Sequence, residues 1–189
     1  MLHLRLYANG HLEVTIPRIC ALLYISMDRL TFAPIKIISD IMKEAKLIAK
    51  AANFTAVDFG NWNELQDYTL PLSPDTAIPG KVFGGQTVNT TGAEFSFQVF
   101  APGTESGFLH THNTHEELYF FLSGKGEYQV DGQNIPVQEG SVVRVAPEGR
   151  RTVRNNGDEP MVMLCIQYPT GDGNVTSADG TILDDKVEW

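Results

Sequence analysis

Three of the five histidines in this 189-residue chain fall within six consecutive positions, His110-Thr-His112-Asn-Thr-His115. His110 and His112 are separated by one residue, so on a β-strand both imidazoles point to the same face. Glu117 comes five residues after His112, and a chain reversal between them places its carboxylate opposite the two histidines. Two imidazoles and one carboxylate form a facial set that suits Fe, Mn, Ni, Co or Zn. We interpret His110, His112 and Glu117 as candidate metal ligands and His115, in the expected turn, as a bystander.

The same three side chains also suit chemistry without a metal. A histidine with a pKa near neutrality can both accept and donate a proton. His110, His112 and Glu117 are therefore also candidates for general acid and base groups in an enolisation or epimerisation. A hairpin whose polar residues are merely solvated is the structural alternative to either kind of site.

The chain after position 93 carries the pattern of short antiparallel strands. Apolar residues alternate with polar ones in Glu94–Phe100, a period of two that predicts a strand. Turn glycines recur every eight or nine residues from Gly124 to Gly157, which is typical of a sandwich or small barrel. Asp131-Gly132 predicts a tight hairpin, because both residues tolerate positive φ. Further strands are expected at Glu117–Leu122, Glu127–Val130, Ile135–Val137, Val142–Ala146, Arg151–Arg154 and Met161–Gln167. The fold class is therefore mainly β and antiparallel.

A barrel of these strands would have a cavity in its interior, where every second side chain points. If Glu117 points inward, so do Tyr119 and Phe121, and Gln167 is a further candidate for ligand contact. Four of the seven basic residues after position 52 fall within eleven positions, Arg144 and Arg151 among them. We interpret these two arginines as candidates for bidentate contacts to a carboxylate or phosphate of a small ligand. The alternative is that the arginines face solvent or surface carboxylates.

The N-terminal region differs in charge from the rest of the chain. Residues 1–52 hold seven basic and four acidic side chains, whereas the remainder holds seven basic and nineteen acidic ones, so we place a boundary near residue 53. Apolar residues spaced by three and four over 34–52, with lysines between them, predict a basic amphipathic helix. Residues 53–93 read as an irregular lead-in and 171–189 as a C-terminal arm that docks on the barrel or on a neighbour. Internal methionines at 27 and 42 raise the hypothesis that residues 1–41 are not part of the natural product.

Composition narrows the classes of partner. A formal charge of −9 disfavours nucleic acid, and the longest charge-free apolar stretch near the start is too short to span a bilayer. Two cysteines cannot form a disulfide framework and indicate a reducing compartment, the cytoplasm. Exposed sheet edges favour a homodimer. The expected partner is therefore a small molecule, with no nucleic acid and no membrane.

Residues 103–157 resemble the cupin family. The family's first motif, G-x5-H-x-H-x(3,4)-E-x6-G, is matched by His110-x-His112-x4-Glu117-x6-Gly124, with the leading glycine one position early at Gly103. The second motif, G-x5-P-x-G-x2-H-x3-N, is matched loosely from Gly140 through Pro147 and Gly149 to Asn155, and its histidine is replaced by Arg151 or Thr152.

The resemblance implies an antiparallel double-stranded β-helix, a jelly-roll barrel, with its core at 94–170. It also implies a divalent transition metal (Fe, Mn, Ni or Zn), held here by three ligands in place of the family's usual four. The expected function is the binding or conversion of a small sugar-like or carboxylate ligand. An enzyme of this kind would be a metal-dependent oxygenase or a sugar isomerase or epimerase. The alternative is a metal-free cupin module that binds a ligand or regulates, without catalysis.

Overall fold

The computed structural model describes residues 3–6, 12–16, 19–21, 43–73, 76–170 and 179–189, which form two compact units, Met1–Asp40 and Ile41–Trp189. In the first unit, β1 (His3–Leu6), β2 (Leu12–Ile16) and β3 (Ile19–Ala21) form an antiparallel sheet in chain order. In the described part of the chain, no helix has the length and apolarity that crossing a membrane requires.

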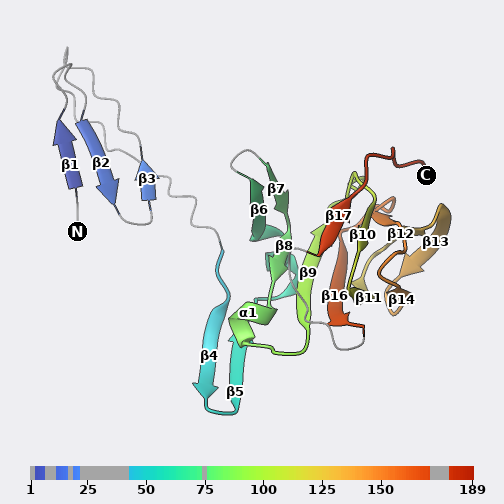
Figure 1. Cartoon of the computed structure of the whole chain (residues 1–189), viewed down its shortest axis with the longest axis horizontal. Helices are drawn as coiled ribbons and strands as arrows, with labels where there is room; N and C mark the ends of the chain where they lie inside the picture. Colours follow the sequence, from blue (N-terminus) through green and yellow to red (C-terminus); the bar gives the residue numbers. More distant parts are fainter. Residues whose placement is uncertain (1–2, 7–11, 17–18, 22–42, 74–75, 171–178) are drawn as a thin grey trace. The chain divides into compact units, whose positions relative to one another are not determined.

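The second unit is built on two five-stranded sheets in which every pairing is antiparallel (Figure 1). One sheet has the order β14-β11-β16-β9-β8 and the other β13-β12-β15-β10-β17. Their strands are β8 (Lys81–Phe83), β9 (Glu94–Phe100), β10 (His110–His112), β11 (His115–Ser123), β12 (Lys125–Val130), β13 (Gln133–Gln138), β14 (Val142–Val145), β15 (Arg151–Arg154), β16 (Met161–Pro169) and β17 (Gly180–Ile182). The fold is mainly β, as the alternating pattern predicts.

Side chains of the two sheets share one apolar core. Tyr119 and Phe121 from β11 pack with Tyr128 from β12 and Val153 from β15, and all four are buried. A second cluster covers the outer face of the first sheet, where Leu65 packs against residues that include Phe97. Because strand side chains alternate between faces, β9 contributes to both clusters and to the cavity between the sheets.

Residues 43–93 contain more regular structure than the sequence pattern indicates. They form two hairpins and a 3-10 helix before the chain enters the first sheet at β8, and a short α-helix after it. The elements are β4 (Lys46–Ala51), β5 (Phe54–Asp58), the 3-10 helix η1 (Trp62–Asp67), β6 (Thr69–Ser73), β7 (Thr76–Pro79) and α1 (Gly85–Val88).

The amphipathic helix expected over 34–52 is wrong where the structure can test it. Lys46–Ala51 form strand β4, paired with β5, and every residue of β4 is exposed. The apolar stripe therefore has no surface to pack on as a helix, and backbone pairing with the neighbouring segment overrides a weak local preference. Residues 34–42 lie outside the described part of the chain.

The C-terminal residues dock on the barrel. Strand β17 pairs with β10 along its whole length (Figure 1), and the Trp189 indole donates a hydrogen bond to Glu105 Oε2 at 2.6 Å. The Arg154 guanidinium lies over the Trp189 ring, 4.4 Å from its centroid. Residues 179–189 thus close one side of the sheet that contains the histidine strand.

Candidate metal centre and ligand cavity

The two histidines of β10 face the cavity between the sheets. His110 pairs with Arg151 on β15 and with Ile182 on β17, and the backbone N–H of His112 donates to Pro147 O at 2.8 Å. Both imidazoles line the cavity, as expected for strand residues two positions apart. Strand β17 lies close against them: a Cβ added at Gly180 would sit 3.2 Å from the His112 ring.

Glu117 is the most heavily bonded side chain of the site. Its Oε1 accepts a hydrogen bond from Gln167 Nε2 at 2.8 Å and one from Cys165 Sγ at 3.3 Å, and it lies 3.4 Å from His112 Nε2. Its Oε2 accepts from Arg151 through Nε at 3.0 Å and Nη2 at 2.7 Å, and from the Tyr119 hydroxyl. One carboxylate oxygen is therefore anchored by Arg151 while the other faces His112.

The charges of the site follow from burial and from these neighbours. Burial opposes ionisation of Glu117, but the adjacent His112 and the charge of Arg151 outweigh it and hold the pKa of Glu117 well below its usual range. Burial, followed by the charge of Arg151, lowers the pKa of His110 to about 3. At neutral pH the carboxylate is therefore ionised and the His110 imidazole is neutral, which are the forms that ligate a metal.

The positions and the missing hydrogen bonds of the candidate ligands fit a divalent cation. His110, His112 and Glu117 each offer a ligand atom, and these atoms lie within 4.8 Å of one another. His110 Nδ1 and both ring nitrogens of His112 are buried without a hydrogen-bond partner. Buried polar atoms are nearly always satisfied, so unpartnered nitrogens beside an ionised carboxylate are a reason to expect a cation there.

A second group of possible ligands shares His112. His115 Nδ1 lies 3.0 Å from Asp179 Oδ2, which is 3.7 Å from His112 Nδ1, and the His112 and His115 rings are 3.9 Å apart. Asp179 Oδ2 also accepts backbone N–H groups of Asn113 and Thr114, each at 3.0 Å. His115 is 1% exposed and is the first residue of β11 rather than part of a turn. Asp179 thus fixes the loop between the two ligand-bearing strands.

A cavity of about 580 Å³ opens onto the histidines. Polar groups from both sheets line it: Ser96, Gln98, His110, His112, Glu117, Tyr119 and Gln167. Apolar side chains, among them Phe83, Phe100 and Met163, make up much of the remaining wall. A few polar groups on a mostly apolar wall are typical of a small-molecule site.

Comparison with known proteins identifies the family of this domain. Residues 96–167 match the family model of the Cupin domain. A cupin protein from Bacteroides fragilis is 32% identical to this chain, over 64% of this chain and 95% of its own, with a TM-score of 0.47. The chain belongs to the cupin superfamily.

Curated relatives resemble this cupin over part of their length. A glucose-6-phosphate isomerase from Pyrococcus horikoshii is 33% identical over 116 residues, 59% of this chain and 52% of the isomerase. An oxalate-binding protein from Thermotoga maritima is 26% identical over 72 residues, 38% of this chain and 59% of that protein. The cupin described here spans about half the length of the curated relatives it matches.

The residues that the sequence predicts to contact a small molecule lie in three different surroundings: the cavity wall, the apolar core and the outer face. Tyr119 and Gln167 line the cavity, and Gln167 bonds Glu117 directly. Phe121 is 1% exposed and belongs to the apolar core rather than to the cavity wall. The expectation that Arg144 faces a ligand is wrong: its side chain is 57% exposed and pairs with Glu116. Arg144 opposes Leu118 across the strands, and not Glu117, so it lies on the outer face.

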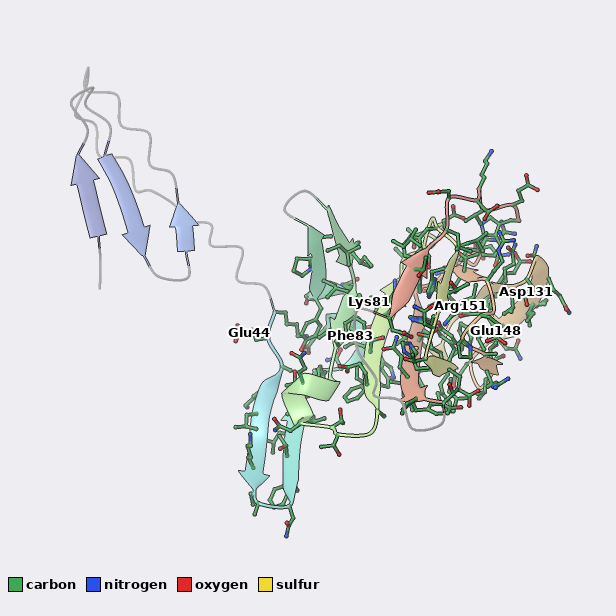
Figure 2. All side chains as sticks on the ribbon, in the orientation of Figure 1. Glu44, Lys81, Phe83, Asp131, Glu148 and Arg151 are labelled. Atoms are coloured by element: carbon green, nitrogen blue, oxygen red, sulfur yellow. The ribbon has the colours of Figure 1, made fainter. Side chains whose placement is uncertain are left out.

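Arg151 lies among the strands of the cupin (Figure 2), and its side chain binds Glu117 and two backbone carbonyl groups. Besides the bonds to Glu117, Arg151 Nη1 donates to Pro147 O at 2.7 Å and to Gly149 O at 2.8 Å. The side chain is fully buried and is not part of the cavity wall. Arg151 and Thr152 are the two residues that stand where the second cupin motif would have its histidine, and of these two Thr152 lines the cavity.

Sequence reasoning missed Asp179, Lys81 and Gln98. Asp179 lies in an arm rich in glycine and aspartate, where no local pattern marks it as different. Lys81 precedes the short apolar run Val82-Phe83, and its inward orientation becomes evident only from the register of β8 with β9.

Proposed function

We propose that this cupin binds a divalent transition metal through His110, His112 and Glu117 and receives a small sugar-like or carboxylate ligand in the adjoining cavity. One observation carries the proposal: imidazole nitrogens with no hydrogen-bond partner lie buried beside an ionised carboxylate on the wall of a 580 Å³ cavity. When bound, a divalent metal would act as a Lewis acid that polarises a ligand oxygen.

The chain's own residues prepare such a site. Arg151 and Gln167 hold the two oxygens of Glu117, so the carboxylate is fixed before a ligand arrives. Burial, together with the charge of Glu117, raises the pKa of Tyr119 well above its usual value, so its hydroxyl stays protonated and donates to Glu117. The apolar wall excludes water and strengthens each polar contact in the cavity.

The ligand class is supported by the relatives and by the cavity. The relatives named above are a sugar-phosphate isomerase and an oxalate-binding protein, and both ligand types carry oxygen atoms suited to a metal. The cavity volume of about 580 Å³ also lies in the range typical of small-molecule sites. Since the chain matches these relatives over about half of their length, their activities guide the choice of assays.

Elemental analysis by inductively coupled plasma mass spectrometry, on protein purified without a histidine tag, tests the metal site. We expect near-stoichiometric Fe, Mn, Ni or Zn in the wild type and its loss in His110→Ala and Glu117→Gln. His115→Ala serves as the matched control, since it removes a buried imidazole from the second group only. Loss of metal in His115→Ala with retention in His110→Ala would instead assign the ion to His112, His115 and Asp179.

A metal-free binding module is the second candidate, and one observation favours it. The charge of Glu117 is already compensated by a fully buried arginine, which takes the electrostatic place of a cation. Protein that does not bind Fe, Mn, Ni or Zn on titration but does bind a small acid or sugar would support this candidate. A metal-loaded protein would instead direct the search to oxygenase and sugar isomerase or epimerase assays.

We also propose that the chain works as a cytoplasmic homodimer. The hairpin β4–β5 exposes Leu47 (57%), Ile48 (65%) and Phe54 (55%), and exposed apolar patches on a folded chain mark sites of association. Cys165 is a buried free thiol, as suits a reducing compartment. Multi-angle light scattering is expected to give twice the chain mass, and Ile48→Glu to give the monomer.

A further inference from the structure

Lys81 reaches the cavity from the edge strand β8. Lys81 is paired with Gln98 on β9, and Phe83 is paired with Ser96 on the same strand. Val82, which lies between Lys81 and Phe83, packs in the outer apolar cluster. Because side chains alternate along a strand, Lys81, Phe83, Ser96 and Gln98 share one face, and all four line the cavity. Figure 2 shows Lys81 and Phe83 on the strand beside β9.

The position of Lys81 is set by rigid backbone contacts. Gly80 N donates to Tyr68 O at 2.7 Å and Val99 N donates to Gly80 O at 2.8 Å. Gly80 has φ +69°, and a Cβ there would lie 2.7 Å from Val99 O. The strand therefore enters the sheet in one register, and the next residue points inward.

The Lys81 amine has little to balance its charge. It donates to Gln98 Oε1 at 3.3 Å and lies 5.4 Å from the centroid of the Phe83 ring. Of the residues the structure describes, no carboxylate forms an ion pair with it, whereas Lys43 is paired with Glu64 at 2.8 Å. Burial lowers the pKa of Lys81. The amine is partly buried, and the charge of Glu117 acts on it without forming an ion pair. Such an amine is costly to desolvate unless a bound group supplies the missing charge.

We propose that Lys81, supported by Gln98, is an oxyanion subsite that binds a carboxylate or phosphate group of the ligand. The inference rests on the proposed function, in which the cavity takes a small molecule, and it narrows that molecule to an anion. Lys81 is the one lysine or arginine among the described residues that line the cavity. The Gln98 amide, 7% exposed, orients the amine toward the cavity through its carbonyl oxygen.

Isothermal titration calorimetry on the full chain tests the subsite. The probes are succinate for a carboxylate source, inorganic phosphate for a phosphate source, and succinamide as an uncharged control. Lys81→Met should weaken binding of the preferred anion by at least about tenfold, since a hydrogen bond to a charged group is being removed. Lys81→Arg should recover part of that loss, because it restores the positive charge. Lys125→Met, which changes an exposed lysine outside this cavity, should bind as the wild type does.

The outcomes separate this inference from the metal proposal. Metal content measured on the same samples should be unchanged in Lys81→Met. Anion binding that depends on Lys81 in metal-free protein would uphold the subsite while the metal proposal fails. Equal anion affinity in wild type and Lys81→Met, with both folded by circular dichroism, would overturn the subsite. So would a wild type that binds neither anion at millimolar concentrations, or one that binds succinamide as well as succinate.

Discussion

The Glu117 carboxylate depends on Arg151 for its charge. Both side chains are at most 3% exposed, and Arg151 meets Oε2 at 2.7 Å while also satisfying two backbone carbonyls. Removing one partner of a buried pair leaves the other uncompensated, which costs about 3–5 kcal/mol. In metal-free protein we therefore expect Arg151→Met to lower the free energy of unfolding by that amount, measured by urea denaturation.

Arg144→Met is the matched control for Arg151→Met. Its pair with Glu116 lies at the surface, and exposed pairs contribute less than about 1 kcal/mol. A loss in Arg151→Met no larger than in Arg144→Met would show that the buried pair does not stabilise the barrel. If a bound metal supplies the compensating charge, adding it should reduce the deficit of Arg151→Met.

His110 makes the stability of the metal-free protein depend on pH. Its pKa is about 3 in the folded chain against 6.5 for an ordinary histidine, so between these values the unfolded chain binds a proton that the folded chain does not. Stability must then fall as the pH drops below about 6.5, by about 1.4 kcal/mol per pH unit for this group. Urea unfolding in the presence of a chelator, from pH 7 to pH 5, measures the slope.

His110→Asn should flatten that slope. The remaining dependence would come from His115, whose pKa burial also lowers. An unchanged slope in His110→Asn would show that His110 titrates normally in the folded protein.

At the scale of elements, the sequence predicted those strands and turns that depend only on residues close together in the chain. Strands β9 and β15 have the bounds that the alternation predicts, Glu94–Phe100 and Arg151–Arg154. The hairpin at Asp131-Gly132 has φ of 51° and 79°, as a tight primed turn requires. Two of the three candidate ligands face the cavity because they lie two residues apart on one strand. The spacing of apolar residues predicted a helix where β4 is a strand. All residues of β4 are exposed, so pairing with β5 outweighs the helical pattern.

The pattern of neighbouring residues could not predict which strands pair or in which register they pair. Asp179 meets His115 only because β17 pairs with β10 some 70 residues earlier in the chain. The inward orientation of Lys81 follows from its register with Gln98, and the outward one of Arg144 from its register with Leu118. One step of register reverses the face of every side chain, so residue type alone could not assign these three.

Two turn glycines provide a test of how tightly the elements pack. Gly124 and Gly132 both have positive φ, 76° and 79°, but a Cβ at Gly124 would lie 2.5 Å from Pro160 O, whereas nothing lies within 4 Å of one at Gly132. Gly132→Ala should cost about 1 kcal/mol from the backbone conformation. Gly124→Ala should cost clearly more, because backbone atoms must move. Equal losses on thermal or urea unfolding would contradict the close approach at Gly124.

At the scale of the whole molecule, the described residues of the candidate site come from strands spread over most of the second unit. His110 and Glu117 come from opposite sheets, Lys81 enters from one sheet edge, and Asp179 arrives with the C-terminal strand. These elements all lie in Ile41–Trp189, which is one compact unit. Lys43, the first residue of this unit that the structure describes, pairs with Glu64 of the same unit at 2.8 Å.

A chain of residues 42–189 should therefore keep the barrel, its metal content and its anion binding. We expect its thermal midpoint to match that of the full chain within about 2 °C, since a shift of 2–4 °C corresponds to about 1 kcal/mol for a chain of this size. Differential scanning calorimetry, with elemental analysis and titration of succinate or phosphate on the same samples, measures all three properties. A clear fall in the midpoint, or loss of metal or anion, would mean that residues 1–41 support the barrel. Retention of all three would show that the chemistry resides in the cupin unit and that the N-terminal strands serve another purpose.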